Sequence, residues 1–202
     1  MPGILNPLLL EFPEEFTTPR LLIRGPRIGD GAAMNAAILE SLDELRPWMP
    51  WAQKAPSVEE SEANTRASMA RWVERTDLRL LVFRREDGLF LAGSGLHRMD
   101  WSVPSFEIGY WLRTSCTGQG YMTEAVMAIA DFAFGRLCAN RVQIHCEGTN
   151  ARSRAVAERA GFTLEATLRD HKRSLSGELC DTLIFARLRQ HYLNSLRTDQ
   201  TP

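Results

Sequence analysis

The sequence has almost no lysine. It carries 24 basic residues over 202 positions, and only Lys54 and Lys172 are lysine, so the other 22 are arginine. A genome that favours arginine codons is the simplest interpretation; a second is that particular arginines bind phosphate, which suits the planar guanidinium. With 25 acidic residues the formal net charge is -1. This balance speaks against a dedicated nucleic-acid-binding protein, whose domain is usually strongly basic.

Long hydrophobic runs are also missing. No apolar stretch approaches the roughly 18 residues of a membrane span, and the first residues lack the basic start and cleavage site of a secretory signal. Cys116, Cys138, Cys146 and Cys180 form no CxxC pair and no compact cluster with histidine at zinc spacing. We therefore expect no membrane partner, no metal, and reduced thiols in a cytoplasmic protein.

No repeat, linker or low-complexity tract divides the chain. Its length fits one domain with a substantial hydrophobic core, and 44% of its residues are hydrophobic. We expect an N-terminal arm over 1–16, a domain over 17–192 and a polar C-terminal tail over 193–202.

Strand and helix patterns alternate within that domain. Strands are predicted over 20–24, 78–85, 90–97, 106–113, 141–146, 162–168 and 181–188, with a hairpin turn at Asp87-Gly88. Helices are predicted from Asp30 to 39, over 41–46, from Ser57 or Ser61 to about Arg75, over 121–136 and from Asn150 or Ser153 to Gly161. The third helix has apolar residues along one side, at Ala63, Ala67, Ala70 and Val73. The order predicts an α+β fold whose parallel strand pair flanks the helix over 121–136.

A loop with two glycines precedes that helix. Gly118 and Gly120 allow a sharp turn in which successive N–H groups point into one hollow at the helix N-terminus. Such a hollow suits a pyrophosphate. Glycines also precede helices for steric reasons alone, so the loop by itself does not identify a function.

The surroundings of the loop are more specific. Two motifs come first in the chain, Thr18-Pro-Arg-Leu-Leu-Ile-Arg24 and Pro47-Trp48…Trp51. Five more follow in this order: Glu107-Ile-Gly-Tyr-Trp-Leu112, Gly118-Gln-Gly-Tyr121, Asn140-Arg-Val142, Asn150-Ala-Arg-Ser153, and Ala160-Gly-Phe162 with Glu165. This series resembles the GNAT N-acetyltransferases, most closely their RimJ/RimL ribosomal-protein branch, over nearly all of 17–190. The resemblance implies the GNAT fold, a single-domain mixed central β-sheet flanked by helices on both faces.

The resemblance also implies acetyl-CoA as cosubstrate, with coenzyme A as product and no metal. The strand residues Tyr110, Trp111 and Leu112 would pair with the pantetheine arm, and Asn150 would bond to it. The pyrophosphate would take the loop amides of Gly118, Gln119, Gly120, Tyr121 and Met122. Thr117 and Met122 depart from the first and last positions of the family loop, which we expect to weaken binding at most. Arg152 or Arg154 could contact the 3′-phosphate; a solvated basic face is the alternative.

Two residues are expected to do chemistry in the implied transfer. The acceptor amine must lose a proton before it attacks, and Glu107 is the leading base, directly or through water. Its alternative is a solvent-facing strand position. Many GNAT enzymes have a tyrosine at the position of Ala157, where it donates a proton to the leaving thiolate. That proton donor is absent here. Ser153 matches the serine of the RimJ/RimL branch and would form a hydrogen bond to the thioester sulfur or to the pantetheine. Its alternative role is a helix cap.

Other residues near these motifs are secondary candidates for catalysis or acceptor binding. Cys146 could carry an acyl group, although a free cysteine is usually a small buried residue. His145, Glu147 and His97 are reserve bases, and His145 could face the acceptor. Trp48 and Trp51 would pack over the acceptor cleft.

The sequence therefore predicts direct acetyl transfer from acetyl-CoA to a primary amine, such as a protein N-terminal α-amine. A polyamine, amino acid or aminoglycoside acceptor is the alternative within this class. A GNAT-like acyl-CoA sensor without turnover is the alternative outside it. No nucleic-acid partner is expected, and the resemblance allows a homodimer.

Overall fold

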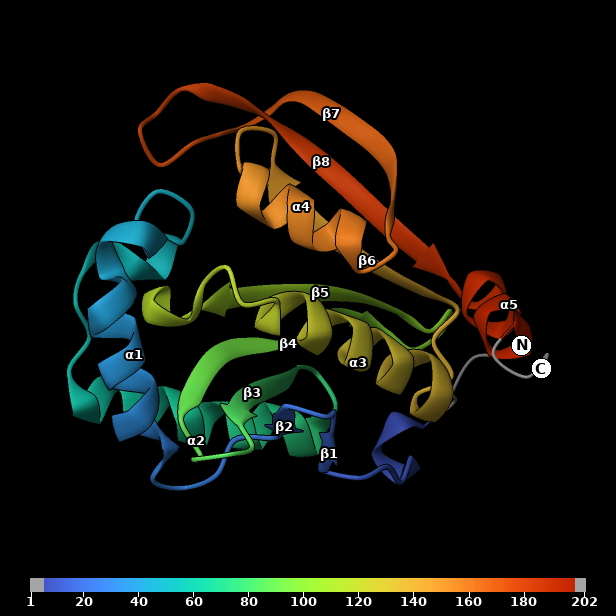
Figure 1. The fold of residues 1–202 in the computed structure, drawn as a ribbon, viewed down its shortest axis with the longest axis horizontal. Coiled ribbons are helices and arrows are strands. Elements are labelled where there is room, and N and C mark those ends of the chain that lie inside the picture. The colour runs from blue at the N-terminus through green and yellow to red at the C-terminus, as the bar shows by residue number, and fades with distance from the viewer. Residues whose placement is uncertain (1–5, 199–202) are drawn as a thin grey trace.

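The computed structural model describes residues 6–198, so residues 1–5 of the expected arm and 199–202 of the expected tail lie outside it. Eight strands in this part form one mixed sheet (Figure 1) in the order β1-β2-β3-β4-β5-β6-β8-β7. Their bounds are β1 Glu15–Thr17, β2 Leu21–Arg24, β3 Leu78–Arg84, β4 Phe90–Asp100, β5 Ser105–Leu112, β6 Arg141–Glu147, β7 Thr163–Arg173 and β8 Leu179–Leu188. All pairs are antiparallel except β5 with β6.

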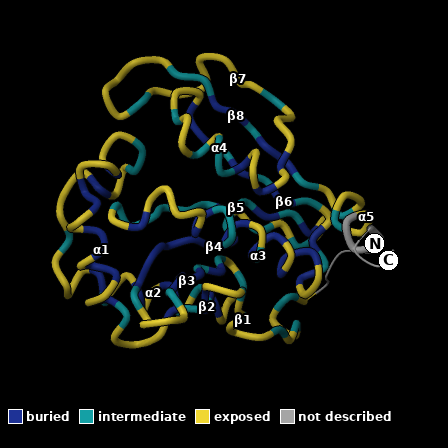
Figure 2. The backbone as a smooth tube through the Cα atoms, viewed as in Figure 1, coloured by how far each residue is buried: buried dark blue, intermediate teal, exposed yellow. Residues whose placement is uncertain are grey.

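Helices cover both faces of this sheet. They are α1 Asp30–Leu45, α2 Val58–Glu74, α3 Tyr121–Arg136, α4 Ala151–Arg159 and α5 Arg189–Thr198, with short 3-10 turns η1 Pro7–Leu9, η2 Pro50–Gln53 and η3 Thr114–Cys116. The chain thus has the predicted mixed central sheet with helices on both faces. Figure 2 shows that burial concentrates in the central strands, whereas β7 at the sheet edge is exposed along nearly its whole length.

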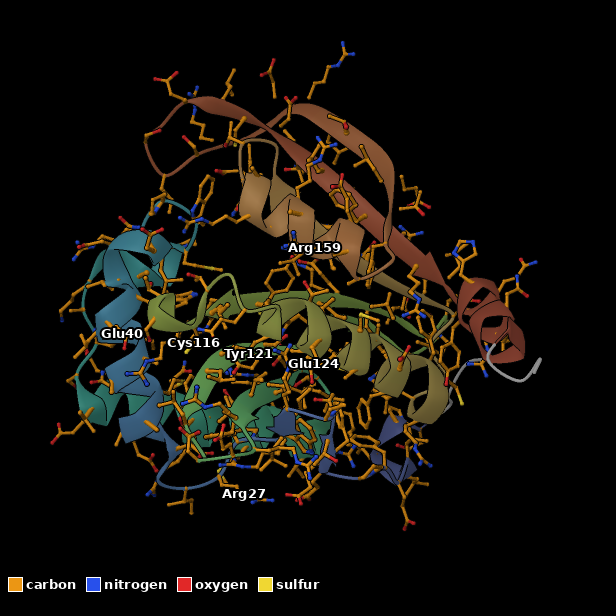
Figure 3. All side chains as sticks on the ribbon, in the orientation of Figure 1. Arg27, Glu40, Cys116, Tyr121, Glu124 and Arg159 are labelled. Carbon is orange, nitrogen blue, oxygen red and sulfur yellow. The ribbon has the colours of Figure 1, made fainter. Side chains whose placement is uncertain are left out.

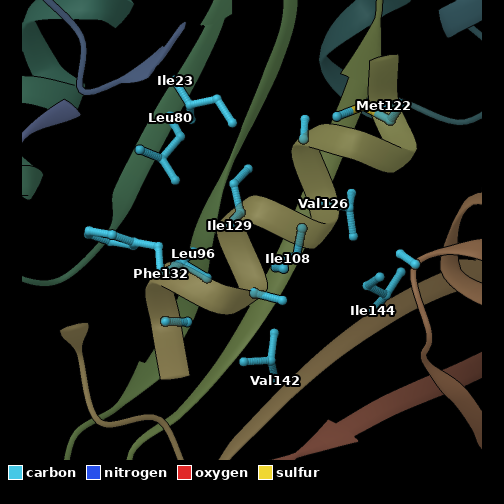
Figure 4. Packing of buried hydrophobic residues seen from close by; sticks show 14 of the residues in the cluster. Ile23, Leu80, Leu96, Ile108, Met122, Val126, Ile129, Phe132, Val142 and Ile144 are labelled. Atoms are coloured by element: carbon cyan, nitrogen blue, oxygen red, sulfur yellow. The ribbon is translucent and has the colours of Figure 1, made fainter. Parts of the chain in front are cut away.

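Alternation along the strands divides the core in two. Leu80 and Val82 of β3 pack with α3 on one face, whereas Leu81 and Phe83 pack with α1 on the other. The side predicted to be apolar in the helix over 121–136 is buried in α3, at Ala125, Val126, Ile129, Phe132 and Ala133. Figure 4 shows this helix against Ile23, Leu96 and Val142. Hydrophobic burial of this kind is the main source of fold stability.

The two parallel strands diverge after three paired positions. Their register ends at Glu107↔Gln143, although β5 continues to Leu112 and β6 to Glu147. The edge of β5 after Glu107 therefore has backbone groups that no strand partner uses. Figure 1 shows the strands splaying apart, with the N-terminal end of α3 on one side of the gap and α4 on the other.

The first helix is longer than predicted. It runs unbroken from Asp30 to Leu45, rather than as two helices meeting near residue 40. The apolar period continues through Ile38 and Leu42, and the buried Ser41 hydroxyl accepts a hydrogen bond from the Thr114 amide. Ser41, a polar residue within this helix, is thus buried in a tertiary contact.

The buried side of α2 differs from its apolar side. The apolar residues Ala63, Ala67, Ala70 and Val73 are exposed, while Ser61, Thr65, Ser68 and Trp72 face inward. The Thr65 and Ser68 hydroxyls donate to backbone carbonyls of the preceding turn, so they are buried with their hydrogen bonds satisfied. The N-terminus of α2 is a capping box between Ser57 and Glu60, which settles the two predicted starts in favour of Ser57.

The segments near both ends of the described chain pack onto the domain. β1 pairs with β2, and Phe12 and Phe16 pack against Phe132 of α3. At the other end, α5 covers most of the segment predicted as a tail, and Tyr192 stacks on Phe134. The final hairpin is also longer than predicted, because β7 and β8 extend to Arg173 and back from Leu179.

Candidate active site

The glycine loop has the conformation that an anion site requires. Gly118 and Gly120 have positive φ angles of 74° and 79°, a region that favours glycine. Across the described residues, no protein acceptor takes the backbone N–H groups from Gly118 to Thr123. Unpaired donors on an exposed loop at a helix N-terminus, with the positive end of the helix dipole behind them, suit a phosphate group.

Residues of α1 fix the start of this loop. Glu40 accepts hydrogen bonds from the Ser115 amide at 3.0 Å and from Arg113 at 2.6 Å. The bonds from Ser115, with help from Arg113, hold the pKa of the Glu40 carboxyl below its ordinary value. Figure 3 labels Glu40 on α1 and Cys116 on the neighbouring turn.

Arg20 holds the other side of the loop, a role that no local sequence pattern indicates. It donates to the Gln119 carbonyl at 2.9 Å and to the Glu124 carboxylate at 2.6 Å, and its guanidinium lies over the Tyr121 ring. Burial would raise the pKa of Glu124, but hydrogen bonds from Thr18 and Arg20 outweigh it and lower that pKa. Figure 3 labels Tyr121 and Glu124 in the first turn of α3.

Tyr110 and Ser153 meet across the gap between the diverging strands. The Tyr110 hydroxyl lies 3.0 Å from both the Ser153 carbonyl oxygen and Ser153 Oγ. Burial raises the pKa of the Tyr110 phenol, so it stays protonated. Asn150, not Ser153, caps α4, because its Oδ1 accepts the Ser153 amide at 3.0 Å. The Ser153 hydroxyl is therefore not needed as a helix cap.

The two arginines nominated for phosphate contact already have carboxylate partners. Arg152 pairs with Glu44 of α1, and Arg154 pairs with Glu158 one turn along α4. Arg159 makes no ion pair within the described chain, and it lines a hollow of about 470 Å³ together with Gly120. This arginine, labelled in Figure 3, is a further cation beside the glycine loop.

A second cavity lies on the opposite face of β5, between the sheet and the first two helices. It has a volume of about 640 Å³. Trp51 and Trp111 form part of its wall with ring centroids 5.9 Å apart, and Gly93 leaves room for the Trp111 ring. Trp48, which the sequence paired with Trp51, does not line this cavity. Trp111 thus presents its side chain to the acceptor side while its strand backbone borders the gap.

Polar side chains gather at one end of this cavity. His97 Nδ1 lies 2.6 Å from an Asp77 carboxylate oxygen, and Arg79 donates to the Asn64 side chain. Burial lowers the pKa of the Arg79 guanidinium, which nevertheless stays charged at neutral pH. Of the four, only His97 was considered from the sequence. Asp77 and Asn64 come from distant segments, so no local pattern could have linked them to it.

Glu107, the predicted base, lies in a different cluster. Its carboxylate is 3.1 Å from Arg98 and 3.3 Å from His145 Nδ1, and its side chain is 14% exposed. It is therefore neither a solvent-facing residue nor part of the cavity wall. Burial lowers the pKa of His145 despite the nearby carboxylate, and His145 Nε2 is buried without a hydrogen-bond partner.

The cysteines show no sign of a nucleophile. Cys146 is buried, and burial raises the pKa of its thiol, which disfavours the reactive thiolate. All four cysteines are unpaired. Within residues 6–198, no group of three or more His, Cys, Asp or Glu residues could hold a metal ion. Over the same range no helix has an apolar stretch long enough to cross a membrane.

Several solved acetyltransferases share this arrangement. The structure of RimL, a ribosomal L7/L12 α-N-protein acetyltransferase in complex with coenzyme A, superposes with a TM-score of 0.81 at 23% identity, covering 88% of this chain and 99% of that one. The microcin C7 self-immunity acetyltransferase MccE, in complex with acetyl-CoA and AMP, gives a TM-score of 0.79 at 22% identity, over 88% and 97%. At these identities the likeness concerns the fold.

Sequence comparison adds closer relatives. A candidate ribosomal N-acetyltransferase, YdaF of Bacillus subtilis (strain 168), is 40% identical over 90 residues, which are 42% of this chain and 49% of YdaF. The chain thus spans about half the length of that relative. The ribosomal-protein-serine acetyltransferase of Escherichia coli (strain K12) is 28% identical over 71% of this chain and 80% of its own. The family description "Acetyltransferase (GNAT) domain" matches residues 20–163. The chain belongs to the GNAT acetyltransferase family.

Proposed function

We propose that the protein transfers the acetyl group of acetyl-CoA directly to a primary amine. The observation that carries this proposal is the run of unpaired amides from Gly118 to Thr123 beside the diverging ends of β5 and β6. The amides suit the pyrophosphate, and the free edge at Tyr110, Trp111 and Leu112 suits the amide groups of pantetheine. The cavity on the other face of β5 gives the amine a separate approach.

Ser153 is proposed to assist the leaving group. Its hydroxyl lies at the end of α4 that faces the gap, and Tyr110 orients it from β5. A hydroxyl there can donate to the sulfur as the C–S bond breaks, which Ala157 cannot do. Asn150 would complete the pantetheine contacts from the same turn, beside its capping role.

Glu107 is proposed to act on the proton of the amine through water. Its carboxylate is held in position by Arg98 and His145. His145 would thus contact Glu107, not the acceptor directly. Trp51 would contact the acceptor, as would Trp111, whose ring lies beside it in the cavity wall.

The proposed acceptor is a protein N-terminal α-amine. Relatives named for ribosomal-protein acetylation support it, as does a cavity of about 640 Å³, large enough for one or two residues of a peptide. A small amine is the second candidate, since the same volume holds an amino acid or polyamine. A cytoplasmic location and a homodimer complete the proposal; size-exclusion chromatography with light scattering tests the dimer.

Release of free thiol tests the function. Purified protein with acetyl-CoA should release coenzyme A when given peptides with free N-termini, and N-terminally blocked copies of the same peptides should give none. Mass spectrometry should place the added acetyl group on the α-amine. If acetyl-CoA raises the Tm but neither peptides nor small amines release thiol, the protein is a sensor and not an enzyme.

A further inference from the structure

We propose that His97 takes the proton directly from the acceptor amine and that Asp77 positions its ring. The assignment rests on the proposed function and refines it, because it gives the first proton of the acceptor amine to His97 and not to Glu107. His97 lines the acceptor cavity, whereas Glu107, its register partner on β5, does not. The proton acceptor would then stand on the side from which the amine arrives.

The contact with Asp77 fixes the state of the imidazole. The carboxylate accepts only, so at 2.6 Å the proton between the two groups is donated from His97 Nδ1. In the neutral ring Nε2 then carries the lone pair, which is the state a general base requires. The same carboxylate stabilises the imidazolium that forms when Nε2 takes a proton, as the aspartate of a serine-protease triad does.

Two glycines make the space that the ring occupies. A Cβ at Gly95 would come within 2.8 Å of His97 Cε1, and a Cβ at Gly109 within 3.1 Å of Cδ2 and 3.4 Å of Nε2. Gly109 immediately precedes the stretch of β5 whose free edge borders the coenzyme gap. The ring therefore lies beside Gly95 of β4 and Gly109 of β5, next to the stretch of β5 that borders both the cavity and the gap.

The charged surroundings of the two candidate bases differ. The Glu107 carboxylate is in contact with Arg98 and His145, so two side chains already occupy it. His97 has one carboxylate partner and no recorded contact with a cation in the described structure. The ionisable groups on the elements around the ring are Asp77, Arg79, Arg98, Glu107, His145, and the Lys54–Glu60 pair across the cavity.

The proposed step is a simple proton and acyl transfer. Nε2 of His97 removes a proton from the ammonium group, and the freed nitrogen pair forms a C–N bond to the thioester carbonyl. The C–S bond breaks and its electron pair leaves with sulfur. The nitrogen still carries two protons and releases one of them, and the thiolate takes up a proton, which gives the amide and coenzyme A. The imidazolium then loses its proton to solvent, which restores the neutral ring.

The test is the pH dependence of thiol release in three variants. His97→Gln should lower kcat by about 10²-fold or more near pH 6.5, the scale of a lost general base. The loss should shrink as the pH rises past about 8, where an α-amine deprotonates without help. Asp77→Asn should lower kcat about tenfold or more with KM little changed, because an amide favours the wrong ring tautomer. His191→Gln, on the exposed helix α5, is the matched control and should leave activity unchanged.

Coenzyme binding separates this role from a structural one. The Tm increase produced by acetyl-CoA should be the same in wild type, His97→Gln and Asp77→Asn. Wild-type kcat in His97→Gln at every pH, with Glu107→Gln reduced at least a hundredfold, would overturn the assignment and leave the proposed function intact. A loss in His97→Gln that stays constant with pH would also overturn it. Wild type that releases no thiol with any amine would instead reject the proposed function itself.

Discussion

The two faces of β5 are built in different ways. On the α3 side, the proposed coenzyme site consists of six consecutive backbone amides, three in the glycine loop and three in the first turn of α3. On the α1 and α2 side, the cavity depends on side chains brought together from distant segments, such as Asp77 with His97 and Asn64 with Arg79. The proposed coenzyme side therefore depends on backbone conformation within one motif, and the proposed acceptor side depends on tertiary contacts. The two should respond differently to single substitutions.

The largest effect is expected on the acceptor side, at Asp30. Its carboxylate bonds Arg24 at 2.6 and 2.7 Å and the Arg27 amide at 2.6 Å, which fixes the start of α1. Asp30→Ala leaves Arg24, only 8% exposed, without its partner. We expect a loss of about 3–5 kcal/mol in the free energy of unfolding, the usual result of breaking a buried pair. Urea denaturation measures it.

Glu15→Gln is the control for this substitution. It breaks the ion pair of Arg27 with Glu15, in which both side chains are more than half exposed. Such a pair contributes less than about 1 kcal/mol. Equal losses in the two variants would mean that the start of α1 does not depend on the buried pair.

The same difference decides what the sequence could reveal. The glycine loop, α3 and the strands beside it were predicted from local pattern, because their conformation is encoded where their residues stand. The continuity of α1 through residue 40 was not predicted. The polar Ser41 is buried there by its contact with the Thr114 amide, 73 positions away, which no local pattern shows. The role of Asp77 was missed for the same reason: nothing near it in sequence marks His97 as its partner.

The second largest effect is expected on the coenzyme side, from a substitution that changes the backbone conformation of the loop. Gly118→Val forces a β-branched residue into a φ of 74°, at a cost of about 1–3 kcal/mol or a displaced loop. We expect the Kd for acetyl-CoA to rise at least about tenfold. Gly177→Val is the matched control, since Gly177 has a φ of 92° and, like Gly118, nothing near its Cβ position. Calorimetry should show that Gly177→Val lowers the stability of the protein but leaves the Kd for acetyl-CoA unchanged.

A smaller effect is expected from arginines around the loop. Arg159 lines the hollow beside Gly120, whereas Arg154 is held by Glu158. Arg159→Ala should weaken acetyl-CoA binding about fivefold at low salt, as expected for an exposed charge contact, and less at high salt. Arg154→Ala should change the Kd less. If Arg154→Ala raises the Kd more than Arg159→Ala does, the 3′-phosphate contact belongs to Arg154.

The smallest effect is expected from Glu40, which links the two sides by tying the coenzyme loop to α1. Hydrogen bonds from Ser115 and Arg113 lower the folded-state pKa of Glu40 below its ordinary value of 4.5. A lowered pKa stabilises the fold above pH 4.5, and this stabilisation disappears as the pH falls through the folded value. Glu40→Gln should therefore lose a little stability at pH 7, and the difference from wild type should shrink below pH 4.5. Glu59→Gln, at an exposed site on α2 without a recorded hydrogen bond in the described chain, should match wild type at both pH values. A Glu40→Gln difference that is the same at pH 7 and pH 3.5 would show that the carboxylate charge does not hold the loop. The coenzyme side would then be independent of α1, as its local sequence pattern suggests.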